Sequence, residues 1–245
     1  MTDETFSSRT ARLIGEEGVA RLASAKVAVF GLGGVGGFVL EGLARAGVGS
    51  FLLADCDVFS ESNLNRQILA TRDTIGRKKT EVALERVKSI NPDANVETFD
   101  GFLDAENVPE LLSRGGISFA VDAVDNVTAK IAIVSESKRL GIPVLSCMGT
   151  GNHLDPARFV IGDLEKSSVC PLARVMRAEL RRRGITGVTA LWSTEPPIKC
   201  AGENGEKLPP ASVSFVPSVA GLLISSHVIA ALSGVSTEHK KDCSL

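Results

Sequence analysis

The sequence predicts an α/β fold of the Rossmann-like type: a doubly wound, mostly parallel sheet with a sheet and helix extension at its C-terminal end. Apolar runs typical of buried strands alternate with helical patterns from Lys26 to Ser146. A glycine-rich turn that begins at Gly31 follows the first run, and Asp55 and Asp122 stand at the ends of two later runs. Because parallel strands bind ligands beyond their carboxyl ends, these residues predict a binding site along that edge.

The expected elements of this first part follow one another with short links. Strands are expected at Lys26–Phe30, Ser50–Ala54, Asn95–Phe99, Ser118–Asp122 and Ile142–Ser146. Helices are expected at Gly34–Ala46, near Lys78–Ile90, near Val108–Ser113 and at Val127–Leu140. Helix breakers support these limits, since Asn91-Pro92 stops the second helix and Gly141 ends the fourth. The alternation favours a parallel sheet that is covered on both faces.

The character of the chain changes after Cys147. A strand is expected at Arg158–Ile161, and a helix from about Pro171 to Arg183, with proline at its first position and a glycine just beyond its end. We see no linker that would divide the chain. The sequence therefore predicts a single domain over 1–245, with a nucleotide-binding half (1–150) and an extension (151–245) that carries substrate or dimer elements.

One C-terminal segment, Val213 to Leu232, is apolar and about as long as a membrane span. It contains Pro217, His227 and several serines, so a buried helix after a short strand fits it better. The membrane-spanning alternative is disfavoured but stays open.

The composition bounds the class of protein. With 245 residues and 44% apolar content, the chain can bury a large α/β core, and a net charge of −2 gives no general attraction to nucleic acid. Any RNA contact must come from a local basic patch. Five cysteines without a C-x-x-C pair argue against structural zinc and fit the reduced thiols of a cytoplasmic protein. The N-terminal residues lack an apolar signal core, which argues against secretion.

The turn after the first strand has the G-x-G-x-x-G spacing of Gly31, Gly33 and Gly36. Glycine suits it because the chain turns sharply there and its backbone must approach a phosphate. Asp55, at the end of the next strand, can accept hydrogen bonds from ribose hydroxyls. By itself this pattern leaves dinucleotide and mononucleotide binding equally open.

The residues that follow favour ATP. Polar and charged side chains come after Asp55 and again after the fourth strand, at Asp57, Asn63, Arg66, Gln67, Arg77, Lys78, Lys79 and Asp122–Asn126. Arginine and lysine suit phosphates, and an aspartate at a strand end suits Mg²⁺. Simpler interpretations stay open, with Asp57 and Asn63 as turn residues and Arg77 and Lys78 as a solvated helix start. A plain NAD-binding module is a competing hypothesis.

Five spaced motifs, within Arg9 to about Gly151, resemble the ThiF/MoeB superfamily of ATP-dependent activating enzymes. They include GLGGVG, LADCDVFSESNLNRQ, GRKKTE and DAVDN. A narrower resemblance, to the tRNA threonylcarbamoyladenosine dehydratases, is carried by FSSRTARLIGEEG, LDP, PLARVMRAELRRRGI and the STE of Ser193–Glu195. The missing C-x-x-C pairs separate the chain from the MoeB and ThiF branches, which activate the C-terminal Gly-Gly of a ubiquitin-like sulfur carrier.

The superfamily resemblance implies roles for individual residues. Arg66 and Lys79 match phosphate-contacting cations, Asp125 matches the acid that supports Mg²⁺, and Arg9 matches an arginine that enters the partner's ATP site, with Arg12 as the alternative. This implies a homodimer. The residues implied to contact ATP are Gly31, Gly33, Gly34, Gly36, Asp55, Asp57, Asn63, Arg66, Gln67, Lys79, Asp125 and Asn126. A monovalent cation and a sulfur-relay protein partner are left open.

The narrower resemblance implies an ATP-driven dehydration. The carboxylate of threonylcarbamoyladenosine, at position 37 of certain tRNAs, would be adenylated, and its ureido group would then close a ring and release AMP. The alternative is an activator of a ubiquitin-like or sulfur-carrier terminus that transfers its acyl group to a cysteine. Cys170 precedes the expected helix start and could be that nucleophile, or a buried thiol that caps the helix poorly.

The expected helix after Pro171 suggests an RNA contact. It carries five arginines, of which the first three share one face: Arg174, Arg177, Arg181, Arg182 and Arg183. Such a stripe can neutralise several phosphates. The equally strong alternative is a solvated face paired with Glu179 or Asp163. The polar loop Lys199–Pro210 could be mobile or could cover the substrate.

Overall fold

The computed structural model describes residues 4–200 and 209–235 and places seven strands in one sheet, in the order β3-β2-β1-β4-β5-β7-β6. All neighbouring strands are parallel except β6 and β7. The predicted fold class is confirmed. The strands are β1 Lys26–Phe30, β2 Ser50–Asp55, β3 Asn95–Asp100, β4 Ile117–Asp122, β5 Val144–Cys147, β6 Phe159–Asp163 and β7 Thr189–Ser193.

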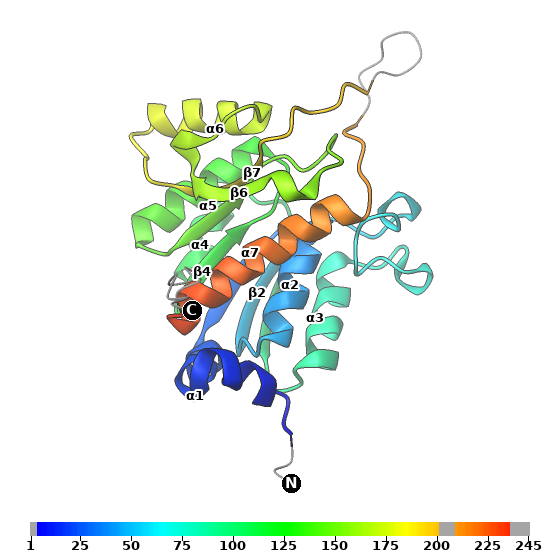
Figure 1. Cartoon of the computed structure of the whole chain (residues 1–245), viewed down its shortest axis with the longest axis vertical. Coiled ribbons are helices and arrows are strands. Elements are labelled where there is room, and N and C mark those ends of the chain that lie inside the picture. Colours follow the sequence, from blue (N-terminus) through cyan, green and yellow to red (C-terminus); the bar gives the residue numbers. More distant parts are fainter. Residues whose placement is uncertain (1–3, 201–208, 236–245) are drawn as a thin grey trace, which may run out of the picture.

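The described residues form seven α-helices, of which α2 to α7 lie on the two faces of this sheet and α1 lies at its end (Figure 1). They are α1 Ser8–Ser24, α2 Gly36–Arg45, α3 Lys79–Ile90, α4 Asn107–Ser113, α5 Val127–Leu140, α6 Pro171–Arg182 and α7 Phe215–Ser233. One buried cluster joins the sheet to α2, α3 and α7, and a second joins it to α4, α5 and α6. The chain therefore buries apolar side chains on both faces of the sheet, as a doubly wound fold requires.

The order of the strands fixes where a ligand can bind. From β1 the chain moves outward to β2 and β3, and it then returns to β4 on the other side of β1. The carboxyl ends of β1 and β4 therefore diverge into helices on opposite faces and leave a crevice between them. The glycine-rich turn after β1 opens at this crevice, beside the ends of β2 and β4.

Two expectations about the ends of the chain need correction. The N-terminal segment forms α1, which the sequence pattern did not predict; Gly15, with φ 76° and ψ 161°, interrupts its helical geometry. No strand precedes α7 in the described residues 209–214. Instead, the Ala211 backbone bonds to Asn152: the backbone N–H of Asn152 donates to Ala211 O, and the side-chain Oδ1 of Asn152 accepts from Ala211 N–H.

The apolar C-terminal segment forms α7, which packs across α2 and reaches α1 (Figure 1). Val216, Ala220 and Ile224 bury one face of α7. The opposite face leaves Leu222 48% exposed and Leu223 37% exposed. Within the described residues α7 alone has the length and composition of a membrane span, a test that core helices of globular domains also pass. The prediction that this segment is a buried helix is therefore confirmed for one face of α7 only.

Candidate nucleotide site

The glycine-rich turn is the most tightly constrained part of the site. Gly31 has φ +88°, and a Cβ built on it would lie 2.7 Å from Ala123 O in the turn after β4. A Cβ on Gly36 would lie 1.8 Å from Gly31 O. Gly33 faces more open space, with the Gln67 amide nitrogen 3.8 Å from its built Cβ. The turn thus presses against the end of β4, and its outer part stays open for a ligand.

Asp55 ties this turn to β2. Its Oδ2 accepts a hydrogen bond of 2.6 Å from Leu32 N–H, and its Oδ1 accepts one of 2.9 Å from Asp57 N–H. The carboxylate is therefore oriented by the backbone at the position expected for a ribose-binding acid.

Lys79, the first residue of α3, brings a positive charge to the same place. Its Nζ lies 2.7 Å from Asp57 Oδ2 and 3.8 Å from Asp55 Oδ1. The lysine side chain is almost fully buried, whereas that of Asp57 is 62% exposed. The ligand atoms of Asp55, Cys56 and Asp57 lie within 4.8 Å of one another, but the Lys79 ammonium already balances this acidic group.

The polar loop after β2 contributes residues of two kinds. The Arg66 guanidinium donates to Ser62 O at 2.7 Å and to Asn65 Oδ1 at 2.9 Å, and it forms no ion pair within the described parts of the chain. Asn63 instead accepts from Ser60 N–H at 3.1 Å and caps a short 3₁₀ turn, the structural alternative considered for it. Arg66 is therefore available to an anion, whereas Asn63 shapes the loop.

Gln67 lies beside the glycine turn and is buried. Its Oε1 has no hydrogen-bond partner among the residues that the structure describes. A buried amide oxygen without a partner costs free energy unless a ligand or water satisfies it. Gln67 thus fits a position in contact with a bound molecule.

The turn after β4 carries Asp125 and Asn126. Asn126 Oδ1 accepts from Ala129 N–H at 3.1 Å and so caps α5. Asp125 is exposed, and within residues 4–200 and 209–235 its carboxylate has no hydrogen bond or ion pair. Of the two predicted contacts, Asp125 is therefore the one whose side chain is free for a ligand.

Beneath this turn the structure shows a buried ion pair that the sequence did not reveal. Asp122 Oδ2 lies 3.0 Å from Lys130 Nζ, and both side chains are 0% exposed. In the sequence Lys130 resembles any lysine on a solvated helix face. The one sequence feature that could have indicated this ion pair is the position of Asp122 at the end of an apolar strand.

Arg9 and Arg12 do not reach this site within one chain. Both are exposed and pair with Glu4, at 3.3 Å and 3.0 Å. The C-terminal end of α1 meets the amino ends of the strands, where Gly49 N–H donates to Leu22 O. Figure 1 shows α1 at that end of the sheet, away from the loops that follow β1 and β2.

The basic helix α6 is largely paired within the chain. Arg181 lies 2.6 Å from Glu165, while Arg182 and Arg183 both bond to Glu179. Arg177 donates to the backbone and hydroxyl oxygens of Ser167. Glu179 was one predicted partner; the other acid is Glu165 and not Asp163. Arg174 alone of the five is exposed without an ion pair or hydrogen bond in the described structure.

The cysteines differ in environment. Cys170 is buried in the core cluster beside Ala173 and Met176, in keeping with the packing alternative. Burial, and then the charges of Asp57 and Asp55, raise the pKa of the Cys56 thiol above its ordinary value. Burial raises the pKa of Cys147 to about 12. Cys243 and residues 201–208 of the loop Lys199–Pro210 lie outside the described residues.

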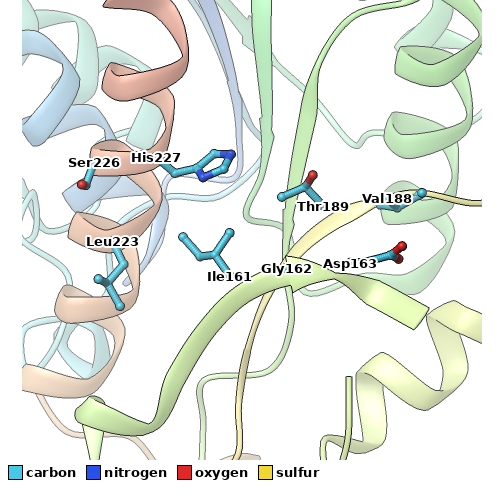
Figure 2. A pocket seen from close by; sticks show the side chains of 9 residues that line it. Ile161, Gly162, Asp163, Val188, Thr189, Leu223, Ser226 and His227 are labelled. Carbon is cyan, nitrogen blue, oxygen red and sulfur yellow. The ribbon is translucent and has the colours of Figure 1, made fainter. Parts of the chain in front are cut away.

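A separate cavity of about 580 Å³ lies between α7 and the antiparallel strands β6 and β7. Figure 2 shows the His227 ring and Ile161 directed into it, with Thr189 on the other side. Burial lowers the pKa of His227. Thr189 begins β7, which runs parallel to β5, so this cavity opens toward the amino ends of the strands. It is distinct from the nucleotide edge.

Comparison with known proteins places this geometry in a family. The model of the ThiF family matches residues 7–243. The tRNA threonylcarbamoyladenosine dehydratase of Bacillus subtilis is 39% identical over 235 residues, which cover 91% of this chain and 92% of that protein. The dehydratase of Escherichia coli is 39% identical over 194 residues, 76% of this chain and 72% of that protein.

A solved structure agrees with this likeness. The crystal structure of the Escherichia coli tRNA N6-threonylcarbamoyladenosine dehydratase in complex with ATP superposes with a TM-score of 0.84 at 34% sequence identity. The match covers 92% of this chain and 93% of that one. The resemblance seen in the motifs is thereby confirmed over both halves of the molecule. The chain belongs to the ThiF family, within its group of tRNA threonylcarbamoyladenosine dehydratases.

Proposed function

We propose that this protein catalyses the ATP-dependent dehydration of threonylcarbamoyladenosine at position 37 of tRNA. The observation that carries the proposal is the likeness to dehydratases of this kind, which extends through the C-terminal part of the chain as well as the nucleotide half. The site geometry supports it, since a ribose-binding acid, two cations and a free carboxylate lie around one glycine-rich turn.

The chemistry follows from where charge develops. An oxygen of the substrate carboxylate attacks the α-phosphorus of ATP, and pyrophosphate leaves. Negative charge grows on the phosphate oxygens, so the fixed cations Arg66 and Lys79 stabilise the transition state. The ureido group of the same nucleoside then attacks the activated carbonyl carbon, AMP leaves, and the ring closes with the net loss of one water. No protein nucleophile is needed because both reacting groups belong to one molecule.

Asp125 is the residue we propose to hold Mg²⁺. Its exposed carboxylate offers the hard oxygen ligand that Mg²⁺ prefers, and a single protein carboxylate suffices where phosphates supply further ligands. When bound, the ion would neutralise charge on the phosphates. We also propose that Asp55 and Gln67 bind the nucleoside, and that Asn63 and Asn126 act by shaping the loops.

Two features support a homodimer. Arg9 lies at the end of the sheet opposite to its own glycine turn, so it can serve an ATP site only in a second copy. The exposed face of α7, with Leu222, Leu223 and Phe215, offers apolar surface for such a contact, and the cavity lined by His227 adjoins it.

A complementation experiment tests the dimer. Mixing inactive Arg9→Ala and Lys79→Met proteins should restore activity, because some mixed dimers contain one site with both residues intact. A parallel mixture with Arg12→Ala shows which arginine acts. Absence of recovery in both mixtures, with subunit exchange demonstrated, would contradict the shared site.

The alternative activity, activation of a sulfur-carrier terminus with transfer to a cysteine, finds little support at the site. Cys170 and Cys147 are buried, and the raised pKa of Cys56 keeps it a thiol at neutral pH, so among the described cysteines the exposed Cys200 is the one accessible candidate. Full turnover by a Cys170→Ser variant would exclude the covalent route through that residue. A sulfur-relay partner, a monovalent cation, a cytoplasmic location and the single-domain organisation over 1–245 stay proposals.

RNA binding through α6 is a proposal with a specific test. The pairs of Arg181, Arg182 and Arg183 are surface ion pairs, which RNA phosphates can replace at small cost. Replacing these three residues by alanine should weaken tRNA binding and flatten its dependence on salt. Arg174→Ala is the matched single variant, because Arg174 could bind a phosphate without first breaking an ion pair in the described structure. Unchanged affinity and salt slope in both would place the RNA elsewhere.

The decisive experiment is direct. The protein is incubated with ATP, Mg²⁺ and tRNA that carries the threonylcarbamoyl group, and the released nucleoside is weighed by mass spectrometry. Loss of one water, matched by equal amounts of AMP, is the expected result. AMP formation that instead requires a carrier protein would favour the alternative.

A further inference from the structure

Both members of the buried pair of Asp122 and Lys130 make further hydrogen bonds. Besides Lys130 Nζ, Asp122 Oδ2 accepts from Ser146 Oγ at 2.5 Å, and Asp122 Oδ1 accepts from Val124 N–H at 3.3 Å. Lys130 Nζ also donates to Cys147 O at 2.6 Å. The network thus joins the end of β4, the first turns of α5 and the end of β5.

Such a network is a poor way to gain stability. Removing two charges from water costs several kcal/mol for each ion, and apolar residues of similar size are often as stable or more stable. Other side chains at this level of the core, such as Ile133 and Val134, are apolar. Stability alone therefore does not explain a fully buried aspartate and lysine here.

What the network does hold is the turn Ala123–Asn126. The turn starts at the Val124 N–H bond to Asp122 and ends at the Asn126 cap of α5. Ala123 N–H donates to Phe30 O at 2.8 Å, and Ala123 O packs against Gly31. With both ends fixed, the position of the turn sets where the Asp125 backbone lies and so which region its carboxylate can reach.

We propose that Lys130 is a positioning residue: through Asp122 it fixes the turn 123–126, so that Asp125 faces the phosphates and Ala123 supports the glycine turn. Lys130 touches no reacting atom, since both members of the pair are sealed from the crevice. The inference rests on the proposed function only in its use of ATP and Mg²⁺.

The test compares four variants. Lys130→Met leaves an uncompensated carboxylate in the core and should lower the melting temperature by about 10 °C. The double variant Asp122→Asn/Lys130→Met removes both charges and should recover most of that loss. Asp125→Asn removes the free carboxylate and should leave the melting temperature unchanged. Lys130→Arg keeps the charge and should retain part of the function.

The measured quantity is the dissociation constant, by calorimetry, of ATP with and without Mg²⁺ and of adenosine. Both Lys130→Met variants should lose about 10- to 100-fold of the Mg²⁺-dependent affinity for ATP. Adenosine, which we place against Asp55 and not Asp125, should lose much less affinity than ATP with Mg²⁺, because only the support of the glycine turn by Ala123 is weakened. Adding Asp125→Asn to the double variant should cost little more, because both changes disable the same carboxylate.

A double variant with a restored melting temperature and wild-type affinity for ATP and Mg²⁺ would overturn the proposal, since the pair would then be only structural. Full additivity with Asp125→Asn would overturn it as well. If Lys130→Met alone does not fold, the double variant decides the matter. Because these readouts measure binding, they stay valid even if the tRNA dehydration assay fails.

Discussion

Two aspartate–lysine pairs stand at the ends of the two strands that flank β1, and they differ in almost every physical respect. Lys79 lies 3.8 Å from Asp55 at the end of β2 and 2.7 Å from the exposed Asp57. Lys130 lies 3.0 Å from Asp122 at the end of β4, where both side chains are wholly buried. The first pair borders the crevice, and the second lies beneath it.

The difference in burial suits the two pairs to the two roles that we propose for them. Asp57 can turn to water at little cost, so Lys79 is free to exchange this partner for a phosphate. Asp122 cannot turn away without leaving a buried charge, so Lys130 has one stable arrangement. An ion pair that opens when a ligand binds needs water or another partner to replace the lost contact. An ion pair that holds a turn in place must have no such replacement nearby.

The largest expected effect comes from disturbing the contact between the glycine turn after β1 and the turn after β4. Gly31→Ala places a Cβ against Ala123 O and at a positive φ, which costs about 1–3 kcal/mol in backbone strain alone. We expect the melting temperature to fall by about 10 °C and ATP binding to be lost, measured by scanning fluorimetry and calorimetry. Gly33→Ala, which meets open space, is the matched control and should melt like the wild type. Equal melting of both variants would contradict this packing.

The next largest effect distinguishes the Lys79 ion pair from the Lys130 ion pair. Lys79→Met should lower kcat/KM for dehydration by about 10²- to 10³-fold, because it removes a cation from the developing phosphate charge. Its melting temperature should change far less than that of Lys130→Met, since Asp57 is exposed. Steady-state kinetics and thermal melting are compared for the two variants. A wild-type rate for Lys79→Met would remove Lys79 from the phosphate site.

A smaller effect is expected at Asp55. Asp55→Asn should weaken the binding of adenosine and of ATP by the same factor, about tenfold, because a charged acceptor for the ribose is lost. Lys79→Met, in contrast, should weaken ATP and leave adenosine unchanged. Calorimetry with both ligands checks this. A loss confined to ATP in Asp55→Asn would place the carboxylate near the phosphates instead.

The smallest effect concerns the cysteine beside each pair. The pKa of Cys56 is raised above its ordinary value, so its reaction with iodoacetamide should be slow at neutral pH and should reach half of its maximal rate only above pH 9. Cys147, with a pKa of about 12 and no exposure to reagent, should react only after unfolding. Peptide mapping by mass spectrometry follows both sites, with the exposed Cys200 as the reactive control. Rapid labelling of Cys56 at pH 7 would contradict the assigned environment.

The elements were predictable where local signals define them. The limits of α5 coincide with the predicted Val127–Leu140, because an asparagine caps its start and Gly141 adopts φ 69° at its end. The helix α1 was missed because Gly15 breaks its pattern and only Gly18 and Leu22 are buried in it. The strand expected before α7 was wrong. Apolar composition alone does not make a strand, because a strand also needs a neighbouring strand with free backbone hydrogen-bonding groups.

By itself the sequence determined the fold class and the edge of the sheet that carries the candidate nucleotide site, because strand and helix periods and the glycine spacing are properties of neighbouring residues. Only the tertiary structure decided which charged residues face that edge. Asp122 and Ser146 meet because β4 and β5 pair in the sheet, and Lys130 meets Cys147 because α5 packs against the ends of these two strands. Burial, which distinguishes Lys79 at the edge of the crevice from Lys130 beneath it, depends on such contacts between distant segments and has no local signature.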